Sequence, residues 1–161
     1  MRWDEVDLDT AKPVWTIPAE RMKARKEHLV PLSDAAVAIL TRQLESRGKS
    51  PFVFPGGRPA KPLSTNAFGM VMDRMGAGEF TPHGFRAAFR SWCADKGVPF
   101  EVAESALAHT SSSVVEAYQR SAMLERRRPV MQAWANYLSE EPSAKVESLE
   151  EGRKRHRKAT P

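Results

Sequence analysis

The order of apolar and polar positions predicts short strands at the beginning of the chain and helices after them. Val14-Trp15-Thr16-Ile17 and His28-Leu29-Val30 are strand-like segments that each end at a proline, and the charged segment 19–27 lies between them. We therefore predict an antiparallel hairpin with a basic loop. Residues 1–9 indicate the end of an element that enters one more short strand.

Beyond the hairpin, apolar residues recur at helical spacing. Helices are predicted over residues 34–47, 65–75, 83–96, 99–108, around Tyr118, and over 124–139. Ser33, Ser64 and Thr81 are the expected N-caps, and glycines end three of these helices. The stripes expected to pack are Val37, Leu40 and Leu44; Phe68, Val71, Met72 and Met75; Phe85, Phe89, Trp92 and Cys93; Val102, Ala103, Ala106 and Leu107; and Val130, Trp134, Tyr137 and Leu138.

These elements predict one mainly α-helical domain over residues 1–140, with a small antiparallel β-sheet near its N-terminus. Residues 141–161 are polar, charged and free of aromatic residues, so a flexible charged tail is expected there. A chain of 161 residues can bury a real core, and 41% hydrophobic content is outside the disordered range.

The net charge of +5 comes from the tail. Without the five basic residues of segment 152–161, the chain has 20 basic and 20 acidic residues. Binding to nucleic acid would therefore depend on local clusters such as 21–26 and 126–128. The single cysteine, Cys93, excludes an internal disulfide and fits a cytoplasmic location. No apolar run reaches the length of a membrane span, and the N-terminus lacks the layout of a signal peptide.

Four side chains with phosphate chemistry follow one another in the second half of the chain. His83 and Arg86 share one face of the predicted helix 83–96, with Arg90 beside them and the apolar stripe opposite. His109 follows on a Ser-rich turn, and Tyr118 comes nine residues later. Imidazole and guanidinium groups can bind a phosphate, and a phenol can attack it.

Four segments occur in a fixed order: Arg21-Met-Lys23-Ala-Arg-Lys-Glu-His-Leu-Val-Pro-Leu, His83-Gly-Phe-Arg86, Leu107-Ala-His109-Thr, and Ala117-Tyr118. Together they resemble the catalytic domain of tyrosine recombinases, most closely phage and genomic-island integrases, over about residues 1–140. The resemblance implies the DNA breaking-rejoining fold and site-specific recombination of double-stranded DNA through a 3′-phosphotyrosyl intermediate.

The resemblance also implies a role for each residue. Tyr118 would be the nucleophile, Arg86, His83 and His109 would act at the phosphate, and Lys23 would be the general acid carried by the hairpin loop. No metal, cofactor, small-molecule substrate or membrane is implied. The full-length parent would act as a homo-oligomer on DNA attachment sites, in the cytoplasm of a bacterium or as a phage-encoded protein.

Taken singly, each of these residues has an ordinary reading. Tyr118 could be a half-buried core residue, Arg86 half of a surface ion pair, and Lys23 a solvated loop residue. His83 could cap a helix, and His109 could belong to a turn. Their joint order favours the catalytic interpretation.

One part of the family pattern has no match. The family begins with an arginine in a Gly-x-Arg-x-x-Glu-type segment, and residues 1–9 look like the sequence that follows that segment. An N-terminally truncated catalytic domain, weak or inactive alone, is therefore expected. Two alternatives stay open, namely a non-enzymatic remnant that binds DNA or an integrase, and an enzyme similar to type IB topoisomerases.

Overall fold

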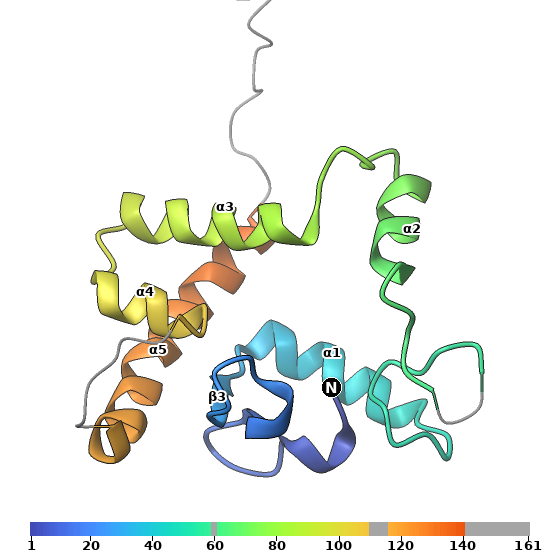
Figure 1. The fold of residues 1–161 in the computed structure, drawn as a ribbon, viewed down its shortest axis with the longest axis horizontal. Coiled ribbons are helices and arrows are strands. Elements are labelled where there is room, and N and C mark those ends of the chain that lie inside the picture. Colours follow the sequence, from blue (N-terminus) through green and yellow to red (C-terminus); the bar gives the residue numbers. More distant parts are fainter. Residues whose placement is uncertain (59–60, 110–115, 141–161) are drawn as a thin grey trace, which may run out of the picture.

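A computed structural model describes residues 1–58, 61–109 and 116–140, without the side chains of 116–120. In this part of the chain a small sheet is followed by helices α1 to α5 (Figure 1). The strands are β1 (Val6–Asp7), β2 (Val14–Ile17) and β3 (His28–Pro31), and the helices are α1 (Asp34–Glu45), α2 (Ala67–Arg74), α3 (Pro82–Asp95), α4 (Phe100–Ala106) and α5 (Glu116–Ser139). Two short 3-10 helices, η1 (Trp3–Glu5) and η2 (Ala19–Arg21), lie among the strands. The mainly α-helical fold with a small antiparallel sheet is as predicted.

The sheet is antiparallel in the order β1-β2-β3. β2 and β3 pair from Val14 opposite Pro31 to Ile17 opposite His28, which confirms the predicted hairpin. β1 adds a third, two-residue strand, with Val6 opposite Trp15. The hairpin loop carries η2 and then Lys23.

Local signals in the sequence set several helix ends. Ser33 Oγ accepts a hydrogen bond from the amide of Ala36 at the start of α1, and Thr81 Oγ1 accepts one from the amide of Gly84 at the start of α3. Each caps an amide that the helix itself leaves without an acceptor. Gly76 and Gly97 follow α2 and α3 with φ of 68° and 67°, a conformation that glycine adopts without strain. These two caps and two stops are confirmed.

Two small cores hold the chain together. One lies between α3 and α4, where Phe89, Trp92, Cys93, Ala103 and Leu107 are buried and α5 covers them with Val130, Met131 and Trp134. The other joins the N-terminus to α1 through Trp3, Leu40 and Val53. α5 contacts α4, β3 and α1, and α3 crosses its C-terminal end (Figure 1). The longest helix therefore links the sheet to the helices.

The prediction of two separate helices around Tyr118 and over 124–139 is wrong. α5 runs without a break from Glu116 to Ser139 and contains Pro129. The stripe on this helix is also shorter than predicted. Tyr137 stacks on Trp134 with ring centroids 5.5 Å apart, yet it is 49% exposed, and Leu138 is 62% exposed. Packing on α3 reaches the ring of Tyr137, which lies 6.0 Å from that of Trp92 between centroids, and leaves Leu138 exposed at the end of the helix.

The prediction for α2 is also wrong in part. The helix begins at Ala67 after Asn66 rather than at a Ser64 cap, and only Met72 of its stripe is buried. Phe68, Val71 and Met75 are exposed by 47%, 47% and 71%. α2 stands apart from α4 and α5 (Figure 1), and its ring contact is with Phe85, which is itself 48% exposed rather than packed.

Other boundaries differ by one to two residues. α1 ends at Glu45 with Leu44 exposed, and α4 is shorter than predicted at both ends. Among the described helices, none combines the length and apolar content needed to cross a bilayer. The predicted tail, 141–161, lies outside the described residues.

Candidate active site

Helix α3 presents its polar face to solvent through His83 and Arg86, both exposed. They stand about one turn apart because they are three positions apart in the helix, whose start is fixed by Thr81 and Pro82. The opposite face carries Phe89, Trp92 and Cys93 into the core. The apolar face therefore holds the helix in place while the polar face stays accessible to a ligand.

His109 is positioned by the end of α4. The amide of His109 donates to the carbonyl of Glu104 at 2.9 Å, and the amide of Ala108 donates to Ser105 at 3.1 Å. Ala108 has a φ of 56°. These two hydrogen bonds, together with the left-handed conformation of Ala108, form a Schellman motif, which reverses the chain direction at the helix end. The reversal turns His109 back toward α3.

Arg86 and His109 meet across the gap between these helices. Arg86 Nη2 donates to the carbonyl of Leu107 at 2.7 Å and lies 3.1 Å from His109 Nε2. The bond to Leu107 holds the guanidinium beside the chain reversal. Since an arginine has five N–H donors, these two bonds leave three that could bind phosphate oxygens.

A carboxylate lies behind this pair. Glu104 Oε2 is 2.7 Å from His109 Nδ1, and Glu104 Oε1 accepts from Arg90 Nε at 2.6 Å. The hydrogen bond from His109, followed by the bond from Arg90, lowers the pKa of Glu104 below its ordinary value and outweighs the opposite effect of burial. Sequence reasoning did not single out Glu104, and the only available signal was an acid five residues before His109 at a helix end.

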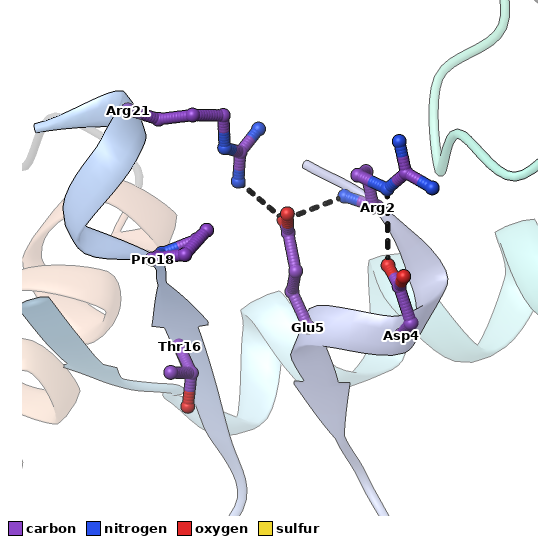
Figure 2. A pocket seen from close by; sticks show the side chains of 6 residues that line it. All are labelled: Arg2, Asp4, Glu5, Thr16, Pro18 and Arg21. Atoms are coloured by element: carbon purple, nitrogen blue, oxygen red, sulfur yellow. Dashed lines mark hydrogen bonds and ion pairs between the residues drawn. The ribbon is translucent and has the colours of Figure 1, made fainter. Parts of the chain in front are cut away.

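Lys23 lies on the exposed loop between β2 and β3. The base of this loop is anchored two residues earlier, where the guanidinium of Arg21 pairs with the carboxylate of Glu5 (Figure 2). Glu5 also accepts from the amide of Arg2 at 2.9 Å and from Trp15 Nε1 at 3.2 Å. Burial tends to raise the pKa of Glu5, but these three bonds prevail and lower it. Arg2, Glu5 and Arg21 line an open pocket of about 460 Å³, together with Asp4, Thr16 and Pro18 (Figure 2).

The structure therefore brings together only some of the five predicted site residues. Arg86 and His109 are brought together, and His83 shares the exposed helix face with Arg86. For Lys23 and His83, the described residues give no contact with that pair. Tyr118 lies at the third position of α5, and its side chain, like that of Arg120, is outside the described residues.

Comparison with known proteins identifies the family. Residues 1–125 match the phage integrase family, which is well over half of the chain. The chain belongs to the phage integrase family. The matched range includes the loop with Lys23, the polar face of α3, the chain reversal at His109, and Tyr118.

Integrases of phages and prophages are among its relatives. Prophage integrase IntA of Escherichia coli (strain K12) is 38% identical over 148 residues, which cover 90% of this chain and 35% of IntA. Prophage integrase IntZ of the same strain is 39% identical over 139 residues, covering 85% of this chain and 34% of IntZ. The integrase of Shigella phage Sf6 is 37% identical over 145 residues, covering 87% of this chain and 37% of that protein. This integrase-family chain thus spans about a third of these relatives' lengths. No solved structure gives a significant match to it.

Proposed function

We propose that this chain is the catalytic part of a site-specific DNA recombinase that cuts and rejoins strands through a phosphotyrosyl intermediate. The observation that carries the proposal is the contact of Arg86 with His109, which are 23 residues apart in the sequence. Two side chains suited to a phosphate thus share one exposed surface. Family membership, and relatives that are named integrases, support the same function.

In the proposed reaction, the three remaining donors of Arg86, with His83, bind the non-bridging oxygens of a DNA phosphate. The phenolic oxygen of Tyr118 attacks the phosphorus, and the bond from phosphorus to the 5′-oxygen breaks. As the bound phosphate draws Arg86 Nη2 away from His109 Nε2, this ring nitrogen is freed to accept the phenolic proton, and Lys23 Nζ donates a proton to the leaving 5′-oxygen. The 5′-hydroxyl of another strand then reverses these steps and releases the tyrosine.

The choice of Tyr118 as nucleophile follows from the two tyrosines of the sequence. Tyr137 stacks against Trp134 and lies 6.0 Å from Trp92, measured between ring centroids, at the far end of α5. Tyr118 begins the same helix, close in sequence to His109. Tyr137 thus belongs to the aromatic packing, which leaves Tyr118 for the chemistry.

The test uses the full-length parent and a suicide DNA substrate that carries its attachment site. Tyr118→Phe should abolish the covalent protein–DNA adduct on a denaturing gel and leave DNA affinity within about twofold, because it removes only a hydroxyl. Tyr137→Phe is the matched control and should still form the adduct. An adduct with Tyr118→Phe would refute the assignment.

The same experiment separates the alternatives. A non-enzymatic DNA-binding remnant would give no adduct with the unmodified parent. A topoisomerase-like enzyme would form the adduct, relax supercoiled DNA without a second site, and give no recombinant product from paired sites. The proposal requires both the adduct and the recombinant.

A further inference from the structure

Glu104 connects the backbone and the side chain of His109 to one helix. Its carbonyl accepts from the amide of His109 at 2.9 Å, and its carboxylate lies 2.7 Å from Nδ1 of the same residue. The side chain of Glu104 is 22% exposed, whereas that of His109 is 53% exposed. A mostly covered acid therefore faces an imidazole that is itself about half exposed.

The neighbours of the ring determine which nitrogen carries the proton. Arg86 has only donors, so the Nε2 atom that it contacts at 3.1 Å must be an acceptor. In the neutral ring the proton then resides on Nδ1, which can donate to Glu104. An ionised carboxylate only accepts, so this partner requires the same tautomer. The two contacts agree, and the unprotonated Nε2 lies on the side of Arg86.

Arg90 holds the carboxylate in turn. Its Nε donates to the second oxygen of Glu104 at 2.6 Å, and its guanidinium carbon lies 4.7 Å from the centre of the Phe100 ring. Each carboxylate oxygen therefore has its own partner, which fixes the rotation of the group. The lowered pKa of Glu104 agrees with a carboxylate that stays ionised at neutral pH.

We propose that Glu104 is a positioning residue that fixes the Nδ1-protonated tautomer and the orientation of His109, and that Arg90 orients Glu104. The consequence for catalysis rests on the proposed function, because it is Nε2 of His109 that would receive the proton of the nucleophile. The consequence for the tautomer does not, because it concerns only the folded chain.

The first experiment is therefore independent of DNA. The chain is labelled with ¹⁵N, and the ring nitrogens of its histidines are followed by long-range ¹H–¹⁵N correlation at neutral pH, with His109→Gln to assign the signals. The native chain should show the Nδ1–H pattern for His109. Glu104→Gln, whose side-chain oxygen can still accept, should keep that pattern, whereas Glu104→Ala should give the averaged shifts of a mixed population.

Glu101 supplies a matched control on the same helix. It is an exposed acid paired with Arg126 at 2.8 Å, and no contact joins it to His109 in the described part of the chain. Glu101→Ala should leave the His109 pattern unchanged. If Glu104→Ala keeps a pure Nδ1–H pattern while the amide spectrum shows a folded chain, Arg86 alone sets the tautomer and the proposal is wrong. If Glu104→Ala does not fold, Glu104→Leu is measured in its place, with the same outcomes.

The second experiment concerns the full-length parent and the rate of adduct formation. Glu104→Ala should lower the single-turnover cleavage rate about 10- to 100-fold, by analogy with the loss of carboxylates that orient metal-bound histidines, with DNA affinity unchanged. Glu104→Gln should recover most of that rate. A changed tautomer with an unchanged rate would leave Glu104 as the orienting group and remove His109 from the proton transfer. A parent that forms no adduct at all would contradict the proposed function instead.

Discussion

Ala108 adopts a conformation that costs free energy. With a φ of 56°, it occupies the left-handed position of the Schellman motif, where a β-carbon crowds the backbone. The chain accepts this cost because the reversal brings His109 within hydrogen-bond distance of Arg86. A residue with no direct role in the site thus determines its geometry.

Ala108→Gly should therefore stabilise the chain. Removal of the β-carbon relieves the left-handed strain, and the greater flexibility of glycine in the unfolded chain offsets part of the gain, so the free energy of unfolding should rise by roughly 0.5–1 kcal/mol. Urea denaturation followed by circular dichroism measures this change. Ala38→Gly, at an exposed position inside α1, is the control and should lower stability by about 1 kcal/mol. A loss of stability in both variants would contradict the account.

At the scale of single residues, the sequence predicts the residues proposed to act at the phosphate better than the residues that hold them in place. Arg86 and His109 can be singled out from motif order, because each belongs to a short local segment. Glu104 cannot, because its role depends on the reversal at Ala108, and alanine is not a residue that signals a left-handed conformation. Tyr118 remains a prediction from the sequence.

At the scale of the elements, β3 and α5 pack around two basic side chains, His28 and Arg127, whose pKa values are both lowered. Arg127 of α5 is buried, with 4% exposure, and donates to the carbonyls of Met123 and Ser105 at 3.4 Å each. Burial lowers its pKa to about 10. Burial and then the charge of Arg127 lower the pKa of His28 in β3 to about 4. The sheet and the helix therefore meet around a neutral histidine.

Stability should consequently fall in mild acid. His28 titrates near its ordinary value of 6.5 in the unfolded chain but near 4 in the folded chain, so between these pH values the unfolded state binds more protons. The contribution is complete above pH 6.5 and is lost as the pH falls to about 4. The shift of the pKa corresponds to about 3 kcal/mol, from which screening by solvent subtracts a part because the imidazole is only partly buried. His28→Gln, measured by urea denaturation at several pH values, should remove this part of the slope. The same slope in the variant would assign the acid sensitivity to other groups.

At the scale of the elements, features set by neighbouring residues were predicted better than the packing of one element on another. The hairpin 14–31 and the caps at Ser33 and Thr81 follow from neighbouring residues, and they are confirmed. The exposure of most of the apolar stripe on α2 could not be predicted from its own sequence. The spacing of apolar residues indicates which face of a helix can pack, but not whether another surface lies against that face. The predicted break in α5 lay between Tyr118 and Leu124 and not at Pro129, and the observed helix runs through both places.

Across the whole molecule, ion pairs occupy many of the basic side chains. Pairs join Arg2, Lys12, Arg21, Arg90, Arg126 and Arg128 to nearby acids. Exposed pairs of this kind add little stability, but they reduce the positive potential available to a DNA backbone. Binding of DNA by this chain alone should therefore depend on few phosphate contacts, so that it is weak and depends only shallowly on salt.

The 161-residue chain by itself should form the DNA adduct far more slowly than the full-length parent. The sequence contains no match to the first arginine of the family pattern, and loss of one charge-assisted donor at the phosphate lowers a rate by about 10²–10³. A suicide substrate and a denaturing gel compare the two proteins at equal concentration. Equal rates would show that another residue of this chain supplies the donor. Arg90 is already bound to Glu104, so Arg120→Ala would be the variant to examine then.

The burial of Cys93 allows opening of the helical core to be measured by thiol labelling. This is the sole thiol of the sequence, it has 0% exposure among α3, α4 and α5, and burial raises its pKa. A thiol reagent can reach it only when these helices separate. The labelling rate, extrapolated to low denaturant and compared with that of the unfolded chain, therefore gives the free energy of opening this helical core. The chain thus carries an internal reporter for the surface that supports Arg86, with no mutation required.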